Sequence, residues 1–271
     1  MASAVYHHAR LAWLLGLRSR AFRGLAVIGA CLLVMAWISG AFSLRQPAIV
    51  AMDVGLSGLR FLGTFFVLYW VQEIFVRDVE RRTIMLALAY PVSRSSYLVG
   101  RWAGVLALVA MAVATWAFGL AVLAQVSDWG YPASAHPDLG LAFPMVLAGI
   151  LLDLAVVSIF TVWLTSLAQT PLVPFLGGAA FAVAARLIGP SIDYLAFSLS
   201  ADKVMSANML PILDAVRWVV PDLSRLDWRT AVLYKTWPAP ANVASGIAMA
   251  LGYIVTLALL AVRNYQKRDF S

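Results

Sequence analysis

The chain has 271 residues, of which 62% are hydrophobic and 12% are charged, with 20 Lys and Arg against 13 Asp and Glu. An ordinary soluble domain carries about 25% charged residues, so water is not the main solvent of this protein. The single cysteine, Cys31, excludes an intrachain disulfide and a Cys-x-x-Cys site. The basic residues gather at the ends of apolar runs rather than on one polar face, which argues against nucleic-acid binding.

Residues 1–24 are predicted to form a cytoplasmic helix in the membrane interface. Val5 to Arg20 mixes leucine and tryptophan with histidine and arginine, as interfacial helices do. The alternative is a frayed basic extension of the first membrane span. No small-residue cleavage site follows, so we expect this segment to be retained.

Residues 25–271 form a predicted six-span transmembrane domain. Several stretches of about 20 residues are apolar all round, and lipid accepts such stretches only as helices that satisfy their own backbone hydrogen bonds. The sequence therefore predicts an all-α polytopic membrane protein with six transmembrane helices and short outer helices before the last one. The fifth span is expected to be short, kinked or partly re-entrant because prolines bracket it. The predicted spans are Leu25 to Phe42, Val54 to Val76, Trp102 to Val126, Leu141 to Leu167, Leu172 to Pro190, and Val243 to Val262.

The distribution of Lys and Arg predicts the orientation. Residues 1–24, the loop after the second span and the tail 263–271 are rich in basic residues, whereas the short loops on the other side hold only Arg45. By the positive-inside rule both termini are cytoplasmic, which places a multi-pass protein in a bacterial inner membrane.

The loop between the second and third spans, residues 77–101, is the most informative stretch. Its first half favours a helix, Tyr90 and Pro91 break that helix, and Ser93 can cap a second one. Ile84 to Ala89 is apolar although the loop is cytoplasmic, so we expect it to be buried against the bilayer or another protein.

This loop carries a Glu and a Thr, a leucine-rich turn, Tyr-Pro-Val-x-Arg and Leu-x-Gly-Arg-x-x-Gly. It resembles the corresponding loop of type 2 ABC transporter permeases, closest to the branch that includes permeases for multicopper-enzyme maturation. Arg82 stands where members of that family often have Gly. The matching residues are Glu80, Thr83, Tyr90, Pro91, Val92, Arg94, Leu98, Gly100, Arg101 and Gly104.

The resemblance implies a permease subunit of an ATP-driven exporter, coupled through this loop to a separate ATPase. Two ATPase copies and a second copy of this chain would complete the transporter, with ATP and Mg on the ATPase and no cofactor on this chain. The alternative is that the loop charges only fix topology and bind lipid headgroups. The coupling residues would be Glu80, Arg81, Thr83, Tyr90, Pro91, Arg94 and Arg101.

Charged side chains inside apolar spans are costly and therefore suggest function. Asp153 lies in the middle of the fourth span and Arg186 in the fifth. A buried pair of these two would lower the cost of both, and would line the translocation path or lock two helices together. Arg60 and Glu73 lie toward opposite ends of the second span, where we expect them to reach the interfaces, and Glu73 is also a candidate for the polar path.

Residues 191–242, predicted to be periplasmic or re-entrant, are too many for a simple turn. In exporters of the family that the loop resembles, this connection carries short helices that cap an outer gate. That resemblance assigns the gate to Pro211, Trp218 and Pro221. A folded periplasmic loop without a gating role is the alternative.

Catalytic signatures are missing from the sequence: there is no HExxH, GxSxG, GxGxxG or GxxxxGK[ST] motif. The sequence therefore predicts no catalytic residue and no metal ligand. A rival to transport is a membrane anchor that relays ATPase motion to a periplasmic partner. An intramembrane enzyme would have to rest on Asp153 and Arg186 alone.

Overall fold

The computed structural model describes residues 2–43, 45–76, 94–126, 136–168, 170–197, 203–216 and 219–267, which are helical apart from short connections and contain no strand. Six helices in this part of the chain are long and apolar enough to cross a membrane, which confirms the predicted all-α, six-span fold class. They cover Phe22–Ala41, Pro47–Val76, Arg94–Val126, Ala142–Leu167, Leu172–Phe197 and Pro240–Lys267.

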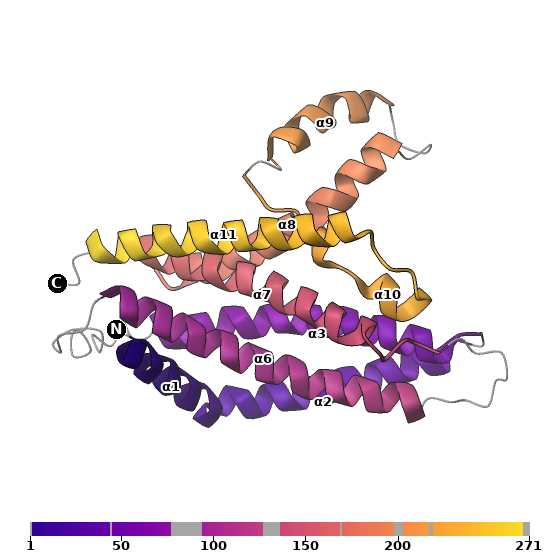
Figure 1. Ribbon diagram of the computed structural model, residues 1–271, viewed down its shortest axis with the longest axis horizontal. Helices are drawn as coiled ribbons and strands as arrows, with labels where there is room; N and C mark the ends of the chain where they lie inside the picture. Colours follow the sequence, from indigo (N-terminus) through magenta and orange to yellow (C-terminus); the bar gives the residue numbers. More distant parts are fainter. Residues whose placement is uncertain are drawn as a thin grey trace.

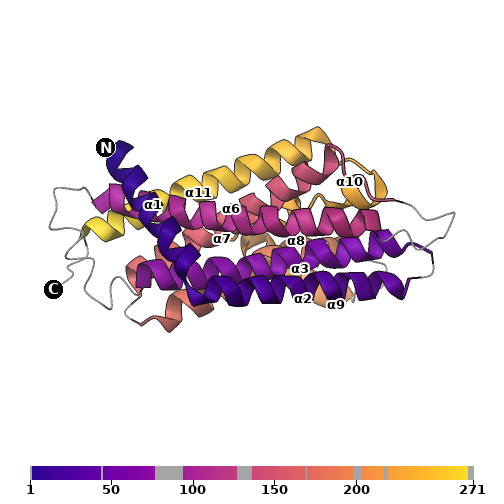
Figure 2. The same ribbon diagram turned by 90° about the horizontal axis from the view of Figure 1, so that it is seen from below.

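The six long helices lie side by side in one bundle (Figures 1 and 2). Helices α3 and α7 form its centre, since 67% of the apolar window of each is buried by protein, against 22% for α2 and 17% for α11. Both chain ends lie at the same end of the bundle, here called the terminal end (Figure 1). The long helices are α2 (Arg20–Ala41), α3 (Pro47–Val71) with its π-helical continuation η1 (Gln72–Val76), α6 (Arg94–Val126), α7 (Ala142–Leu167), α8 (Leu172–Phe197) and α11 (Pro240–Lys267).

The predicted end of the fifth span at Pro190 is wrong, because α8 continues through this proline to Phe197. Proline removes one backbone donor and so frees the carbonyl of Arg186, four residues earlier. The flanking turns keep their own hydrogen bonds, and membrane helices tolerate such a loss where neighbouring groups surround it. The fifth span is therefore a full-length helix.

The N-terminal helix α1 (Ala2–Arg18) is separate from α2, and Ser19 caps α2 by accepting a hydrogen bond from Phe22 N at 3.3 Å. Helix α1 crosses the first turns of α6 (Figure 2). Gly100 and Gly104 allow this contact, because a Cβ at either position would lie 2.7 Å from a carbonyl oxygen of α1. The GxxxG spacing thus packs α1 onto α6, while the location of α1 at a membrane surface stays a prediction.

Three short helices precede the last span: α9 (Lys203–Val216), the 3-10 helix η2 (Leu223–Leu226) and α10 (Arg229–Tyr234). The end of α8 and α9 form a hairpin that projects from the bundle, whereas the chain then returns and α10 lies at the end opposite the termini (Figure 1). This return brings η2 against α7, α8 and α11.

Candidate functional site

Residues 221–228, here called the inserted segment, enter the bundle between membrane helices. Pro221, Leu223, Leu226 and Trp228 are buried, and all but the first belong to the main hydrophobic core. Non-helical backbone at this depth is tolerated only where protein surrounds it. The inserted segment is therefore an internal part of the bundle and not a surface loop.

Glycines on three helices make room for the inserted segment. A Cβ on Gly149 of α7 would lie 2.5 Å from the carbonyl oxygen of Leu226, and one on Gly189 of α8 would lie 2.5 Å from a carboxylate oxygen of Asp222. On α11, a Cβ on Gly246 would lie 3.3 Å from a backbone carbonyl of the segment. The first two approaches are closer than side-chain carbons make. A larger residue at Gly149 must therefore displace the backbone of the inserted segment, and one at Gly189 must displace the side chains of Asp222 and Ser224.

The inserted segment supplies its own local hydrogen bonds. Asp222 caps η2 by accepting from Ser224 N at 3.1 Å and Ser224 Oγ at 2.6 Å. Trp228 Nε1 donates to the carbonyl of Arg225 at 2.8 Å, which closes the turn. An acidic residue before a short helical turn and a tryptophan after it thus define this conformation locally.

Asp153 of α7 is the innermost charged group that the structure describes in the bundle, with none of its surface exposed. Its Oδ2 lies 2.6 Å from Arg60 Nε of α3 and 2.8 Å from Arg186 Nη2 of α8. Arg186 Nη2 also donates to Thr64 Oγ1 at 2.9 Å, and Arg60 Nη2 donates to the carbonyl of Leu223 at 2.7 Å. One carboxylate therefore joins three helices, and Arg60 extends the contact to the inserted segment.

The same arginine begins a second set of ion pairs. Arg60 Nη1 lies 3.0 Å from Asp227 Oδ2. Asp227 also accepts hydrogen bonds from both Nε and Nη2 of Arg229. Arg229 Nη1 then reaches Asp53 Oδ1 at 3.0 Å and Ser57 Oγ at 2.6 Å on α3. The chain after η2 is thereby held to α3 by ion pairs at Asp53 and Arg60, which lie about two turns apart along the helix.

Together these groups form a linear network in which negative and positive side chains alternate. It runs from half-exposed Asp53, at 47% side-chain exposure, through fully buried Asp153 to Arg186. Because the charges balance, each ion offsets part of the desolvation cost of its neighbours. The members in order are Asp53, Arg229, Asp227, Arg60, Asp153 and Arg186.

Two members of the network, Asp227 and Arg229, have shifted pKa values. Burial by itself raises the pKa of Asp227, but hydrogen bonds from Arg229 and the positive charge of Arg60 outweigh it and hold that pKa below its usual value. Hydrogen bonding to Asp227 raises the pKa of Arg229 above the ordinary arginine value, against the effect of burial. Both groups are therefore charged throughout the physiological pH range.

A hollow of about 280 Å³ borders the network between α3, α8 and the inserted segment. Arg60, Arg186 and Arg229 all contribute to its wall. Phe61 and Pro190, both exposed, also line it. The charged groups consequently have open space beside them.

The structure agrees with some predictions for the polar residues in the spans and disagrees with others. Asp153 and Arg186 pair, as expected for two charges buried in neighbouring spans. The prediction that Arg60 reaches an interface is wrong, because three of its nitrogens are bound inside the protein. Glu73 lies in η1, about 20 Å further along the helix, where it accepts a hydrogen bond from Tyr69 Oη at 3.3 Å.

The predicted gate residues do not form one cluster. Pro221 is buried at the start of the inserted segment, whereas Pro211 is exposed within α9 of the projecting hairpin. Trp218 lies outside the described residues. Of these two prolines only Pro221 is buried, and a gating role stays a prediction.

At the terminal end, Arg94 and Arg101 are engaged within the chain. Arg94 Nη1 donates to the carbonyls of Tyr265 and Gln266 at 3.2 and 2.9 Å, and so caps the last turn of α11. Arg101 is 8% exposed, with its guanidinium 5.5 Å from the ring centre of Tyr97. Their contact with an ATPase stays a prediction.

Other predicted coupling residues lie outside the described residues, and their role is a prediction as well. These are Glu80, Arg81, Thr83, Tyr90 and Pro91.

Three members of the network, Asp53, Asp227 and Arg229, were missed by sequence reasoning. A signal for the first exists, because Asp53, Ser57, Arg60 and Thr64 follow one another at intervals of four and three residues and so share one face of a helix. A polar stripe inside an apolar span predicts a polar partner. No comparable pattern marks residues 227 and 229, whose role depends on the return of the chain into the bundle.

These features define a multi-pass membrane protein whose helices hold an inserted, ion-paired segment. The family model described as "ABC-2 family transporter protein" matches residues 17–270. The chain therefore belongs to the ABC-2 transporter family and is a permease subunit that associates with an ABC ATPase. Comparison with curated proteins gives no match.

Proposed function

We propose that this chain is the membrane subunit of an ATP-driven exporter, with the inserted segment as its outer gate. Both termini and the coupling loop, residues 77–101, face the cytoplasm of a bacterium. Two copies of the chain engage two ATPase subunits, which bind ATP and Mg. The observation that carries this proposal is the Asp–Arg network, since it ties the inserted segment to the helix that leads into the coupling loop.

Helix α3 is the mechanical link in this proposal. The coupling loop follows directly after η1, so force from the ATPase enters α3 at the terminal end. The helix and η1 together span 30 residues, or about 45 Å. At the other end they present Arg60 to Asp227 of the inserted segment and Asp53 to Arg229 of α10. A shift of α3 along its axis by part of a turn would separate these residues from Arg229 and Asp227.

The gate would open when Asp227 and Arg229 separate from α3 while Asp153 and Arg186 stay paired. Asp227 and Arg229 remain paired with each other after separation from α3, and the charge that loses its partner, Asp53, is half-exposed. Asp153 and Arg186 likewise remain paired and keep α7 and α8 together. The network can therefore divide into neutral halves at low electrostatic cost, and no bond in the transported molecule is made or broken by this chain.

A membrane anchor that transmits motion to a periplasmic partner is a second candidate, and the projecting hairpin favours it. Phe197 at the end of α8 is 82% exposed, and Ile212 of α9 is 55% exposed. Such side chains suit contact with lipid or with another protein. A link to multicopper-enzyme maturation is part of the proposal only through the loop motif.

Co-purification tests the proposed function. The tagged chain is isolated in mild detergent as native protein, as Glu80→Lys with Arg81→Glu in the coupling loop, and as Arg45→Glu at the opposite end of the bundle. We expect an ATPase with the native chain and with Arg45→Glu, and none with the loop variant. Failure to recover an ATPase with the native chain would contradict the proposal.

A further inference from the structure

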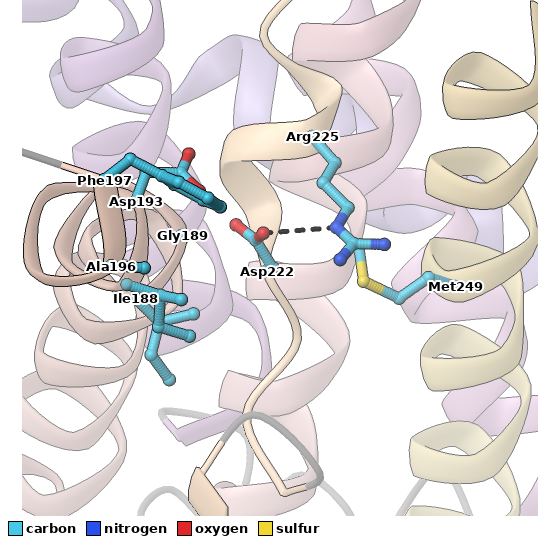
Figure 3. A pocket seen from close by; sticks show the side chains of 9 residues that line it. Ile188, Gly189, Asp193, Ala196, Phe197, Asp222, Arg225 and Met249 are labelled. Carbon is cyan, nitrogen blue, oxygen red and sulfur yellow. Dashed lines mark hydrogen bonds and ion pairs between the residues drawn. The ribbon is translucent and has the colours of Figure 1, made fainter. Parts of the chain in front are cut away.

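A larger hollow lies between the last turns of α8, residues 222–225 and α11 (Figure 3). Its volume is about 580 Å³, and sites for small ligands commonly measure about 300 to 1,000 Å³. Ile188, Phe197 and Met249 give it apolar walls. The hollow therefore has the size and lining of a ligand site, and no side chain of the Asp–Arg network lines it.

Two opposite charges face this hollow without using all of their bonding capacity. Arg225 Nε donates to Asp222 Oδ2 at 3.2 Å, and its two terminal nitrogens have no protein partner among the described residues. Asp193, on the facing side of α8, has no ion-pair partner in the described part of the chain. Figure 3 shows Asp193 and Arg225 on opposite sides of Asp222. The hollow thus offers donors for an anion and an acceptor for a cation.

A groove along α11 adjoins this polar end, because Met249 lines both hollows. A second hollow, of about 480 Å³, shares Met249 with the first and extends past Gly252 and Tyr253. A Cβ on Gly252 would meet no atom within 4 Å, so the groove is open there. Val255, 56% exposed, lies on the same helix in the direction of the terminal end. The groove can therefore receive a hydrocarbon chain along a helix that faces lipid.

We infer that the joined hollows bind a zwitterionic amphiphile. Its phosphate or carboxylate pairs with Arg225, its ammonium group pairs with Asp193, and its hydrocarbon chain lies along α11 over Gly252. A purely anionic head would leave Asp193 unpaired, and a purely cationic head would face Arg225. Only a head that carries both charges uses all of the polar groups, and only an apolar tail suits the groove.

Zwitterionic bilayer lipid and a transported amphiphile share this chemistry. The site itself follows from the geometry of one chain, whereas its use by a transported molecule rests on the proposed function. Binding to the isolated chain and release during ATP turnover are therefore measured separately.

The binding experiment uses the full chain in maltoside micelles. The probe is a short-chain phosphatidylethanolamine with a fluorophore on its acyl chain, followed by fluorescence anisotropy, and the matching phosphatidylglycerol is the anionic comparison. The variants are Asp193→Asn for the head and Gly252→Leu for the groove. Gly24→Leu is the matched control, because a Cβ on Gly24 of α2 also meets no atom within 4 Å.

We expect the ethanolamine probe to bind about threefold to fivefold tighter than the glycerol probe, and Asp193→Asn to abolish that difference. Gly252→Leu weakens both probes about tenfold because it fills the groove, and Gly24→Leu changes neither. Equal affinity of the two probes for the native chain, tighter binding of the glycerol probe, or unchanged binding by Gly252→Leu of normal elution volume would overturn the inference.

The second arm uses the chain co-purified with its ATPase. Loss of bound ethanolamine probe on addition of ATP and Mg identifies a transported molecule, and retention identifies a resident lipid. Both results support the site. Because the first arm needs no ATPase, failure of the proposed function leaves the binding result intact.

Discussion

Replacement of Arg60 by Met removes the central member of the network. The change takes donors from the Asp153 carboxylate at 2.6 Å, the Leu223 carbonyl at 2.7 Å and the Asp227 carboxylate at 3.0 Å. Removing one partner of a buried ion pair costs about 3 to 5 kcal/mol. Asp153 and Asp227 each keep another arginine, so we expect the lower value, about 3 kcal/mol.

A double variant separates charge balance from packing. Arg60→Met with Asp227→Asn leaves two intact neutral pairs, Asp153 with Arg186 and Asp53 with Arg229. We therefore expect the double variant to be more stable than Arg60→Met alone by about 1 kcal/mol, although it contains one more substitution.

The Tm of both variants is measured in detergent, with thermal unfolding monitored by size-exclusion chromatography. A loss of about 3 kcal/mol corresponds to a fall in Tm of about 6 °C, and Arg45→Met outside the spans is the control for loss of one charge. Equal Tm values for Arg60→Met and the native chain, or a double variant with a lower Tm than the single one, would refute the network as a stabilising unit.

Three further predictions concern other parts of the molecule. Gly149→Ala places a Cβ against the Leu226 carbonyl and should lower the Tm by several degrees, whereas Gly24→Ala should not, and equal values would contradict the close approach. The pKa of Asp227 is lowered in the folded state, so its stabilising effect is present above its unfolded value of 3.8 and is lost as the pH falls further. The Tm of the native chain should accordingly fall more steeply than that of Asp227→Asn below about pH 4, and parallel curves would contradict the assigned charge. Arg94→Gln removes the cap of α11 and should speed hydrogen exchange in its last turn, while exchange in α2 serves as the internal reference.

The spans could be predicted from the sequence because membrane helices depend on local apolar length. The ends of the spans were predicted less accurately. Helix α8 passes through Pro190, because one missing backbone hydrogen-bond donor does not end a helix that its neighbours surround. The pairing of Asp153 with Arg186 was predictable from the free-energy cost of burying a charge, because opposite charges lower that cost when they pair.

The rest of the network depends on a non-local event. Asp227 and Arg229 lie in a connection that reads as polar and external, and they become intramolecular partners only when the chain returns between α3, α7 and α8. The glycines that admit this return are on three different helices. Nothing in the local sequence of any one helix indicates that its glycine faces the same segment as the others.

ATPase motion is expected to separate the inserted segment from α3. Spin labels at Phe61 of α3 and Tyr234 of α10, both exposed, in a Cys31→Ser background report the distance between the two helices. Electron–electron resonance is measured on the complex with its ATPase, without nucleotide and after trapping with ATP and vanadate. A longer distance in the trapped state is the predicted result, and an unchanged distance in a complex that hydrolyses ATP would contradict the gate.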